Sequence, residues 1–223
     1  MIKKHIPNTI TCLNLFSGSI AIYYGFQGNY KVVLFLVLLA ALFDFLDGFA
    51  ARLLNAYSPM GKELDSLADV ISFGMAPGVV AFSLLSDSTL PSWVAFAGFL
   101  IPVFSALRLA KFNIDERQTT SFLGMPTPAN AIFWIGIGYS RDKLLDVNEW
   151  VILAAIIITS LLLVSELPMF SLKFKKLKDK QNILQGVFLA GAGALIGAFK
   201  LEAFSLIILW YVVLSVIKVV AKL

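Results

Sequence analysis

The chain has 223 residues, of which 59% are hydrophobic and only 14% are charged, and its formal net charge is +4. A soluble domain carries about 25% charged residues, so this composition excludes a soluble globular protein and indicates an integral membrane protein. The apolar stretches do not alternate as the strands of an outer-membrane barrel do. The basic residues form no aromatic-interleaved stripe of the kind that binds nucleic acid.

Apolar segments predict an all-α fold, a polytopic membrane bundle of about eight transmembrane helices. Glycine, proline and charged residues mark the breaks between these segments, and we expect a single domain over residues 1–223. The expected helices lie at residues 8–25, 31–54, 64–85, 91–112, 126–140, 148–165, 183–198 and 201–217.

The first expected helix is unusually polar for a membrane span. It carries Asn8, Thr9, Thr11, Asn14 and Ser17. Side chains of this kind either form hydrogen bonds with neighbouring helices or line a polar cavity. The sequence leaves both interpretations open.

Small residues and a proline mark two later helices. Gly74, Pro77 and Gly78 predict a kink and close packing in the helix at 64–85. A small-residue face in the helix at 183–198 would allow a homodimer. That face consists of Gly186, Gly191, Gly193 and Gly197.

Basic residues concentrate in alternate loops, and this asymmetry predicts the orientation in the membrane. Only four of the 18 lysines and arginines fall on one side, namely Lys31, Arg141, Lys143 and Lys200. We therefore predict a multi-pass protein of the cell membrane with both termini in the cytoplasm. The cytoplasmic lysines would also contact anionic lipid heads. The cytoplasmic set is Lys3, Lys4, Arg52, Lys62, Arg108, Lys111, Arg117, the five lysines of 173–180, Lys218 and Lys222.

Four carboxylates stand out within apolar surroundings, at Asp44, Asp47, Asp65 and Asp69. Each pair has the i,i+3 or i,i+4 spacing that places two side chains on one helix face. Asp44 lies about 20 Å along its helix, near the cytoplasmic boundary of a hydrocarbon core about 30 Å thick. The second pair opens the next helix, so we expect the two pairs to meet at a similar depth.

Such a group of carboxylates predicts a metal centre, because close like charges cannot all stay ionised without counter-charge. Two divalent cations would balance the four aspartates. An all-oxygen ligand set favours Mg²⁺ or Mn²⁺, and also fits Ca²⁺, but does not favour zinc. Two such ions can hold phosphate oxygens while a nucleophile and a leaving group line up. Nearby, Gly48 and Ala51 leave space for a bulky ligand, and Arg52 could bind a phosphate.

The fixed positions of this stretch resemble the signature of the CDP-alcohol phosphatidyltransferase family. All eight match at the family's spacing, as Asp44-x2-Asp47-Gly48-x2-Ala51-Arg52-x8-Gly61-x3-Asp65-x3-Asp69. The resemblance implies a transferase of phospholipid biosynthesis, in which an alcohol attacks the diphosphate of a CDP-linked lipid and CMP is released.

Roles follow from this resemblance position by position. Asp44, Asp47 and Asp65 resemble metal ligands, and Asp69 resembles both a ligand and the general base that takes the proton of the alcohol. The start of the chain, Pro7-Asn8-Thr9-Ile10-Thr11, is also similar to family members. The implied CDP-binding residues are Asn8, Thr9, Gly48, Ala51, Arg52 and Gly61.

Further segments are similar to those family members whose acceptor is serine. They are residues 65–77 (DSLADVISFGMAP), 108–113 (RLAKFN) and 122–129 (FLGMPTPA). This similarity implies transfer of a phosphatidyl group from CDP-diacylglycerol to the hydroxyl of L-serine. Arg108 and Lys111, at i,i+3, would suit the serine carboxylate or a lipid phosphate, and Asn113 could add an amide contact.

Two alternatives remain. The same chemistry could use another acceptor, glycerol 3-phosphate or inositol phosphate, whose extra phosphate should require more basic groups. A cation transporter would also place carboxylates inside a membrane. It predicts acids near the midplane and inverted repeats, whereas here the acids lie near one boundary and no repeat is evident.

Overall fold

The computed structural model describes residues 5–115, 122–141, 147–170 and 180–221. Within these ranges the fold is helical, apart from one pair of two-residue strands. The elements are α1 (His5–Phe26), α2 (Tyr30–Leu53), α3 (Pro59–Asp69), η2 (Val70–Met75), α4 (Ala76–Ser86), η3 (Ser92–Phe99), α5 (Leu100–Ile114), β1 (Phe122–Leu123), α6 (Thr127–Tyr139), α7 (Glu149–Val164), β2 (Pro168–Met169), α8 (Lys180–Phe199), η6 (Lys200–Glu202) and α9 (Ala203–Val220).

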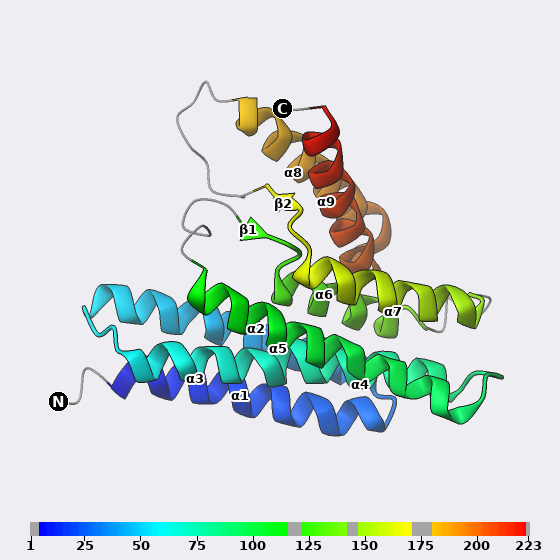
Figure 1. Cartoon of the computed structure of the whole chain (residues 1–223), viewed down its shortest axis with the longest axis horizontal. Helices are drawn as coiled ribbons and strands as arrows, with labels where there is room; N and C mark the ends of the chain where they lie inside the picture. The colour runs from blue at the N-terminus through cyan, green and yellow to red at the C-terminus, as the bar shows by residue number, and fades with distance from the viewer. Residues whose placement is uncertain (1–4, 116–121, 142–146, 171–179, 222–223) are drawn as a thin grey trace.

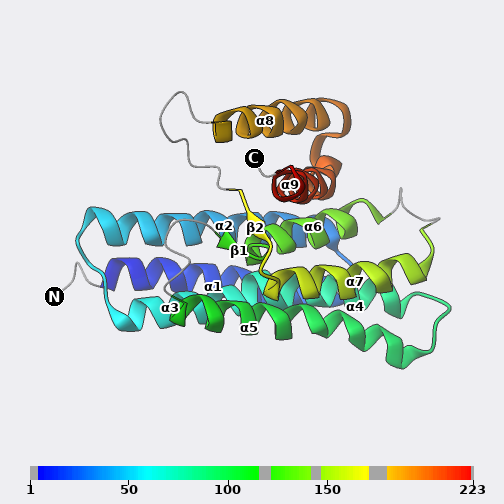
Figure 2. The ribbon, with the colours of Figure 1, turned by 45° about the horizontal axis from the view of Figure 1, so that its top comes forward.

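The helices from α1 to α7 form one bundle along the long axis of the molecule, and α8 and α9 stand to one side of it (Figure 1). α9 packs against α6, and α8 lies on the far side of α9 from the bundle (Figure 2). β1 and β2 pair antiparallel between these two parts, with Phe122 opposite Met169. The acidic stretch therefore belongs to the bundle, at the end where α2 is followed by α3.

Among the residues that the structure describes, four helical segments are long and apolar enough to cross a membrane. They are Tyr30–Leu53, Pro59–Ser86, Ser92–Ile114 and Ile183–Val220. Large apolar side chains are exposed along them, for example Phe35, Phe45 and Leu107, each more than half exposed. The structure therefore confirms an all-helical integral membrane protein, and each of the expected helices coincides with a helical segment.

The predicted start of the third helix was wrong by about one and a half turns. We expected a loop to Glu63, but the helix begins at Pro59. Ser58 caps it, since its hydroxyl accepts a hydrogen bond from the amide of Gly61 at 3.0 Å, and the fixed φ of proline suits the first helical position. Asp65 consequently lies in the second turn of α3.

The segment with the predicted kink contains a short π-helix, η2, directly after Asp69. It packs closely against α1. The space between them is so small that a Cβ added at Gly18 would collide with Ser72. The Ser72 hydroxyl donates to the carbonyl of Asn14 at 3.0 Å. Single-turn π-helices are frequent at functional sites, and this one fixes α1 beside the last aspartate of the motif.

Several basic residues on which the predicted orientation depends lie outside the described residues. They are Lys3, Lys4, Arg117, Lys143, the lysines of 173–178 and Lys222.

Candidate active site

Three of the four aspartates meet between α2 and α3. Asp44 and Asp47 lie near the C-terminal end of α2, and Asp65 lies on α3. One carboxylate oxygen from each of the three lies within 4.8 Å of the others. A short turn over residues 54–58 reverses the direction of the chain, and α2 and α3 both pack against α1. Side chains that are 21 residues apart in sequence therefore reach the same point.

Asp69 lies one turn further along α3 and outside this group of three. Its side chain is buried, at 8% exposed, and the amide of Asn14 donates to its Oδ1 at 3.4 Å. The sequence predicted four acids as one constellation. The structure brings the carboxylates of Asp44, Asp47 and Asp65 within reach of one ion and places Asp69 one turn further along α3, next to η2.

The first helix supplies hydrogen bonds to both parts of the site. Thr11 Oγ1 donates to Asp47 Oδ2 at 2.6 Å, and Asn14 reaches Asp69. Neither residue was among the predicted site residues. Their spacing could have predicted this role. Asn8, Thr11 and Asn14 recur every three residues, so they lie on one face of α1.

The carboxylates border a pocket of about 560 Å³ beside the α2–α3 turn. Its lining includes Asp47 and Asp65 together with four of the predicted CDP-binding residues, Asn8, Gly48, Ala51 and Gly61. Both interpretations of the polar first helix are therefore confirmed, since its polar residues bond to neighbouring helices and also line a cavity.

Two predicted CDP-binding residues do not line this pocket. Thr9 is exposed, and its hydroxyl donates to the carbonyl of His5 in its own helix at 2.9 Å. Arg52 is also exposed, but its guanidinium lies over Gly48, with Nη1 3.8 Å from the place where a Cβ would stand. Arg52 is thus close to the pocket wall, whereas Thr9 faces away.

Gly61 is the tightest point of the pocket wall. A Cβ there would stand 3.0 Å from Asn8 Oδ1 and 3.1 Å from Ser58 Oγ. Most Cβ atoms keep a longer distance from their neighbours, so a side chain at this position would push Asn8 or Ser58 aside, and glycine lets α1 and the cap of α3 come together around the pocket.

The three predicted acceptor-binding residues divide into one inner and two outer side chains. Arg108 is buried, at 7% exposed. Its Nη1 donates to Thr127 Oγ1 at 3.0 Å, and its charge interacts with that of Asp69. Arg108 therefore joins the inner part of the site.

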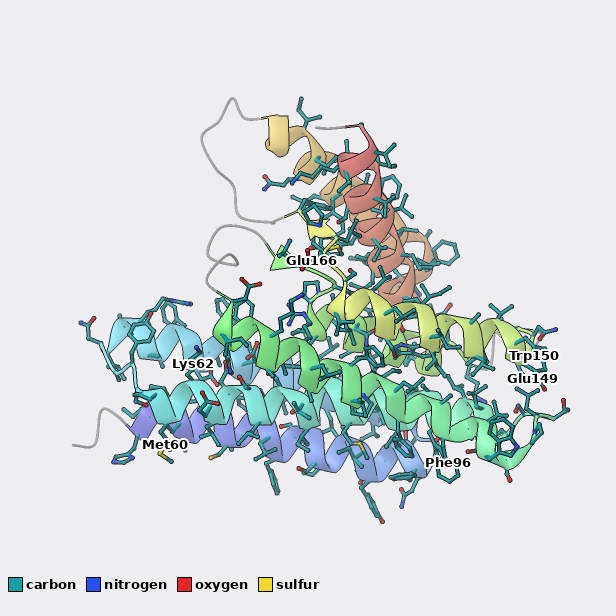
Figure 3. All side chains as sticks on the ribbon, in the orientation of Figure 1. Met60, Lys62, Phe96, Glu149, Trp150 and Glu166 are labelled. Atoms are coloured by element: carbon teal, nitrogen blue, oxygen red, sulfur yellow. The ribbon has the colours of Figure 1, made fainter. Side chains whose placement is uncertain are left out.

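Lys111 and Asn113 instead make contacts at the end of α5. Lys111 pairs with Glu166 at 3.4 Å, and the amide of Asn113 donates to Ser66 Oγ at 2.9 Å. Lys62 donates to the carbonyl of Asn113 at 2.9 Å. Figure 3 labels Lys62 and Glu166, which flank this end of α5.

The residues present fit a divalent metal ion. The ligand atoms are all carboxylate oxygens, which hard cations such as Mg²⁺, Mn²⁺ and Ca²⁺ prefer. Asp65 Oδ1 is buried, and no protein group within the described ranges hydrogen-bonds to it. Buried carboxylate oxygens normally have partners, so this oxygen is well suited to a metal.

Comparisons with known proteins agree with this site. The family model described as CDP-alcohol phosphatidyltransferase matches residues 4–162. Several relatives carry the name CDP-diacylglycerol–serine O-phosphatidyltransferase, among them three from different bacteria. The one from Helicobacter pylori (strain ATCC 700392 / 26695) is 33% identical over 95% of this chain and 90% of its own length.

The other two matches are partial. The Bacillus subtilis (strain 168) protein is 36% identical over 64% of this chain and 80% of its own length. The Mycobacterium leprae (strain TN) protein is 36% identical over 74% of this chain, but this chain spans only 57% of that protein. The family match covers well over half of the chain and includes the whole pocket with its carboxylates, and the chain therefore belongs to the CDP-alcohol phosphatidyltransferase family.

Proposed function

We propose that this protein is a CDP-diacylglycerol–serine O-phosphatidyltransferase, which transfers the phosphatidyl group of CDP-diacylglycerol to L-serine and releases CMP. The observation that carries the proposal is the meeting of Asp44, Asp47 and Asp65, two of which, Asp47 and Asp65, line a pocket together with the signature residues Gly48, Ala51 and Gly61. The names of the relatives support serine as the acceptor.

The pocket beside the α2–α3 turn would take the cytidine diphosphate group. Gly48, Ala51 and Gly61 give it a wall without bulky side chains, and Arg52 is placed to reach a phosphate from outside. Phe45 and Phe49 stack on the outer face of α2, and both are exposed. This apolar face would leave the acyl chains of the substrate in the surrounding lipid.

The metal centre would hold two divalent cations, Mg²⁺ or Mn²⁺, with Ca²⁺ as a further candidate. Asp44, Asp47 and Asp65 would be ligands, and Asp69 would complete the set. Bound there, the cations would neutralise charge on the diphosphate and on the leaving CMP. Thr11 holds Asp47 through its hydrogen bond, which fixes that carboxylate on the pocket side.

Proton transfer falls to Asp69 in this proposal. The serine hydroxyl oxygen forms a bond to the lipid-side phosphorus, and the bond from this phosphorus to the oxygen bridging to CMP breaks. The hydroxyl proton passes to Asp69, acting as general base. Asn14 donates to Asp69 and would orient it, and the charge of Arg108 also acts on this carboxylate.

The charge around Asp69 favours serine over an acceptor that carries phosphate. Arg108 is the buried cation close to Asp69 within the described residues, and Lys111 is paired with Glu166. Glycerol 3-phosphate or inositol phosphate would bring two negative charges, which call for more than one guanidinium. A single arginine suits the carboxylate of an amino acid.

The remaining architecture is also a proposal. We infer one domain of about eight transmembrane helices, with both termini and the active site in the cytoplasm, as the basic residues indicate. A homodimer could use Gly186, Gly193 and Gly197, where an added Cβ would meet nothing within 4 Å. Gly191 does not belong to that free face, because it packs against Trp210.

The decisive experiment is an acceptor panel. Purified protein with CDP-diacylglycerol and Mg²⁺ or Mn²⁺ is given serine, glycerol 3-phosphate, inositol phosphate or water, and CMP release is measured. We expect release with serine alone, together with phosphatidylserine as the lipid product. CMP release with glycerol 3-phosphate or inositol phosphate instead would support phosphatidyl transfer but exclude serine as the acceptor. Metal flux into liposomes without CMP release would instead favour a transporter.

A further inference from the structure

A second pocket, of about 800 Å³, lies at the end of the bundle opposite the aspartates. Helices α6, α7 and α9 line most of it, and α6 packs against the other two. Arg141, one of its lining residues, donates to the Tyr30 hydroxyl at 3.3 Å. Tyr30 begins α2 and lies about 25 Å along that helix from Asp47. The pocket is therefore separate from the proposed active site and calls for a different ligand.

The apolar part of this pocket faces the surrounding lipid. Val151 on α7 and Leu209 on α9 are lining residues whose side chains are exposed, and Trp134 on α6 lines the buried side. Along α7 the lining extends from Glu149 to Ala155, a distance of about 9 Å. One leaflet of the hydrocarbon core is about 15 Å thick. The groove is therefore deep enough for the upper part of one acyl chain.

Charged residues gather at one end of the pocket, where several helices begin or end (Figure 3 labels Glu149 there). The charged lining residues are Asp87, Arg141, Glu149 and Glu202. Arg141 pairs with Asp87 at 2.6 Å, and Glu149 Oε1 accepts hydrogen bonds from the amide and hydroxyl of Thr89. At most about 7 Å of chain separates Asp87 from Thr89. The guanidinium and the Glu149 carboxylate therefore flank one short turn.

The charges at this end are only partly balanced. Arg141 and Asp87 neutralise each other, but no basic side chain among the described residues pairs with Glu149. Glu149 opens α7, where the helix dipole keeps a carboxylate ionised. Ser140, another lining residue, is buried, and its hydroxyl has no hydrogen-bond partner among the described residues. A single carboxylate at a membrane boundary does not require a metal ion, but it favours a ligand with a positive charge.

We propose that this pocket binds a zwitterionic phospholipid whose head group carries a primary ammonium. One acyl chain would lie in the apolar groove, the ammonium would pair with Glu149, and the phosphate would lie on the Arg141 side of the turn. Two carbons separate the charges of such a head group, which suits a carboxylate and a guanidinium on either side of one turn. An anionic lipid without an ammonium would instead place its negative charge near Glu149. The proposal does not depend on the reaction at the aspartates.

Fluorescence quenching of Trp134 tests this assignment, because Trp134 lines the pocket and is only 1% exposed. The full chain, with Trp93, Trp150 and Trp210 replaced by Phe, is placed in phosphatidylglycerol vesicles. Phosphatidylethanolamine or phosphatidylglycerol brominated in the upper half of one acyl chain is then added, since bromine quenches tryptophan only at short range. We expect half-maximal quenching at a mole fraction about threefold lower for the brominated phosphatidylethanolamine, the effect of one partly exposed ion pair.

Glu149→Gln should abolish this preference. The substitution keeps an oxygen for the hydrogen bonds from Thr89 and removes only the charge. Glu166→Gln is the matched control, because that carboxylate pairs with Lys111 at the other end of the bundle, and it should leave the preference as it is in the parent protein. A preference for phosphatidylethanolamine that survives Glu149→Gln, or that Glu166→Gln removes equally, would overturn the proposal.

Two further measurements separate the pocket from the lipid around the protein. A variant that keeps only Trp93, which is exposed and lies outside the pocket, should be quenched equally by the two lipids. Ala155→Phe narrows the groove and should weaken quenching of Trp134 by both. Equal quenching of Trp134 by the two lipids, or no change in Ala155→Phe, would show that no lipid is held in the pocket.

Thermal unfolding of the protein with all its tryptophans gives an independent test in detergent. Phosphatidylethanolamine should raise the unfolding temperature by about 2 °C more than phosphatidylglycerol does, because a ligand of the folded state stabilises it. This difference should vanish in Glu149→Gln and persist in Glu166→Gln. The same unfolding temperature with both lipids would contradict recognition of the ammonium group.

Discussion

The two ends of the bundle both carry pockets and charged side chains, but they arrange their charges differently. At the far end, between α6, α7 and α9, a pocket of about 800 Å³ is larger than the one at the aspartates. Arg141 pairs there with Asp87 at 2.6 Å, and Glu149 accepts hydrogen bonds from the backbone and hydroxyl of Thr89. Figure 3 labels Glu149 at this end and Lys62 at the other.

At the acidic end the charges are alike and close together. Asp44, Asp47 and Asp65 converge on one point, and close like charges are unfavourable unless something else neutralises them. At the far end, by contrast, Arg141 and Asp87 neutralise each other, so this pair requires no bound ion. The comparison teaches that unbalanced charge, rather than pocket size, marks the reactive end of this molecule.

Metal removal should give the largest effect, because it leaves the three carboxylates without counter-charge. We expect EDTA to abolish CMP release and Mn²⁺ or Mg²⁺ to restore it. Addition of metal should also raise the thermal unfolding temperature of the wild-type protein, since a ligand that binds the folded state stabilises it. Addition of metal should not raise the thermal unfolding temperature of the Asp65→Asn variant, which lacks one of the ligands. Full activity after chelation would contradict the metal centre.

Asp69→Asn should lose about a hundredfold to ten-thousandfold in kcat, the usual contribution of a general base. The matched control is Asp87→Asn at the far end, where a partly exposed ion pair contributes little. We expect that variant to keep kcat within about twofold of the wild-type value. If both variants lost activity equally, the contrast between the two ends would fail.

Gly61→Val should raise the KM for CDP-diacylglycerol by about tenfold. Its Cβ would press on Asn8 and Ser58, and its methyl groups would enter the pocket. Gly193→Val is the control, because an added Cβ there meets nothing within 4 Å. An unchanged KM in Gly61→Val would show that the nucleotide does not use this pocket.

Sequence reasoning found the carboxylates because a fixed spacing on two consecutive apolar helices already determines which side chains meet. It named Thr11 and Asn14 as polar residues of the first helix but did not assign them to the site, since their contacts with Asp47 and Asp69 depend on how α1 packs against α2 and η2. The start of α3 was mistaken although Ser58 and Pro59 form an ordinary capping sequence.

The predicted acceptor-binding residues also show that spacing does not reveal burial. Substituting one of them, Lys111, should give the smallest effect on activity. By spacing alone, Arg108 and Lys111 looked equivalent, but only Arg108 is buried beside Asp69, while Lys111 pairs with Glu166 near the surface. Lys111→Ala should therefore change the KM for serine by less than about twofold, in line with the small contribution of exposed ion pairs. Arg108→Lys keeps the charge but loses the planar fork that binds a carboxylate, so its serine KM should rise clearly more. Equal effects of the two substitutions, measured by CMP release at varied serine, would mean that the carboxylate of the acceptor lies at the end of α5 and not beside Asp69.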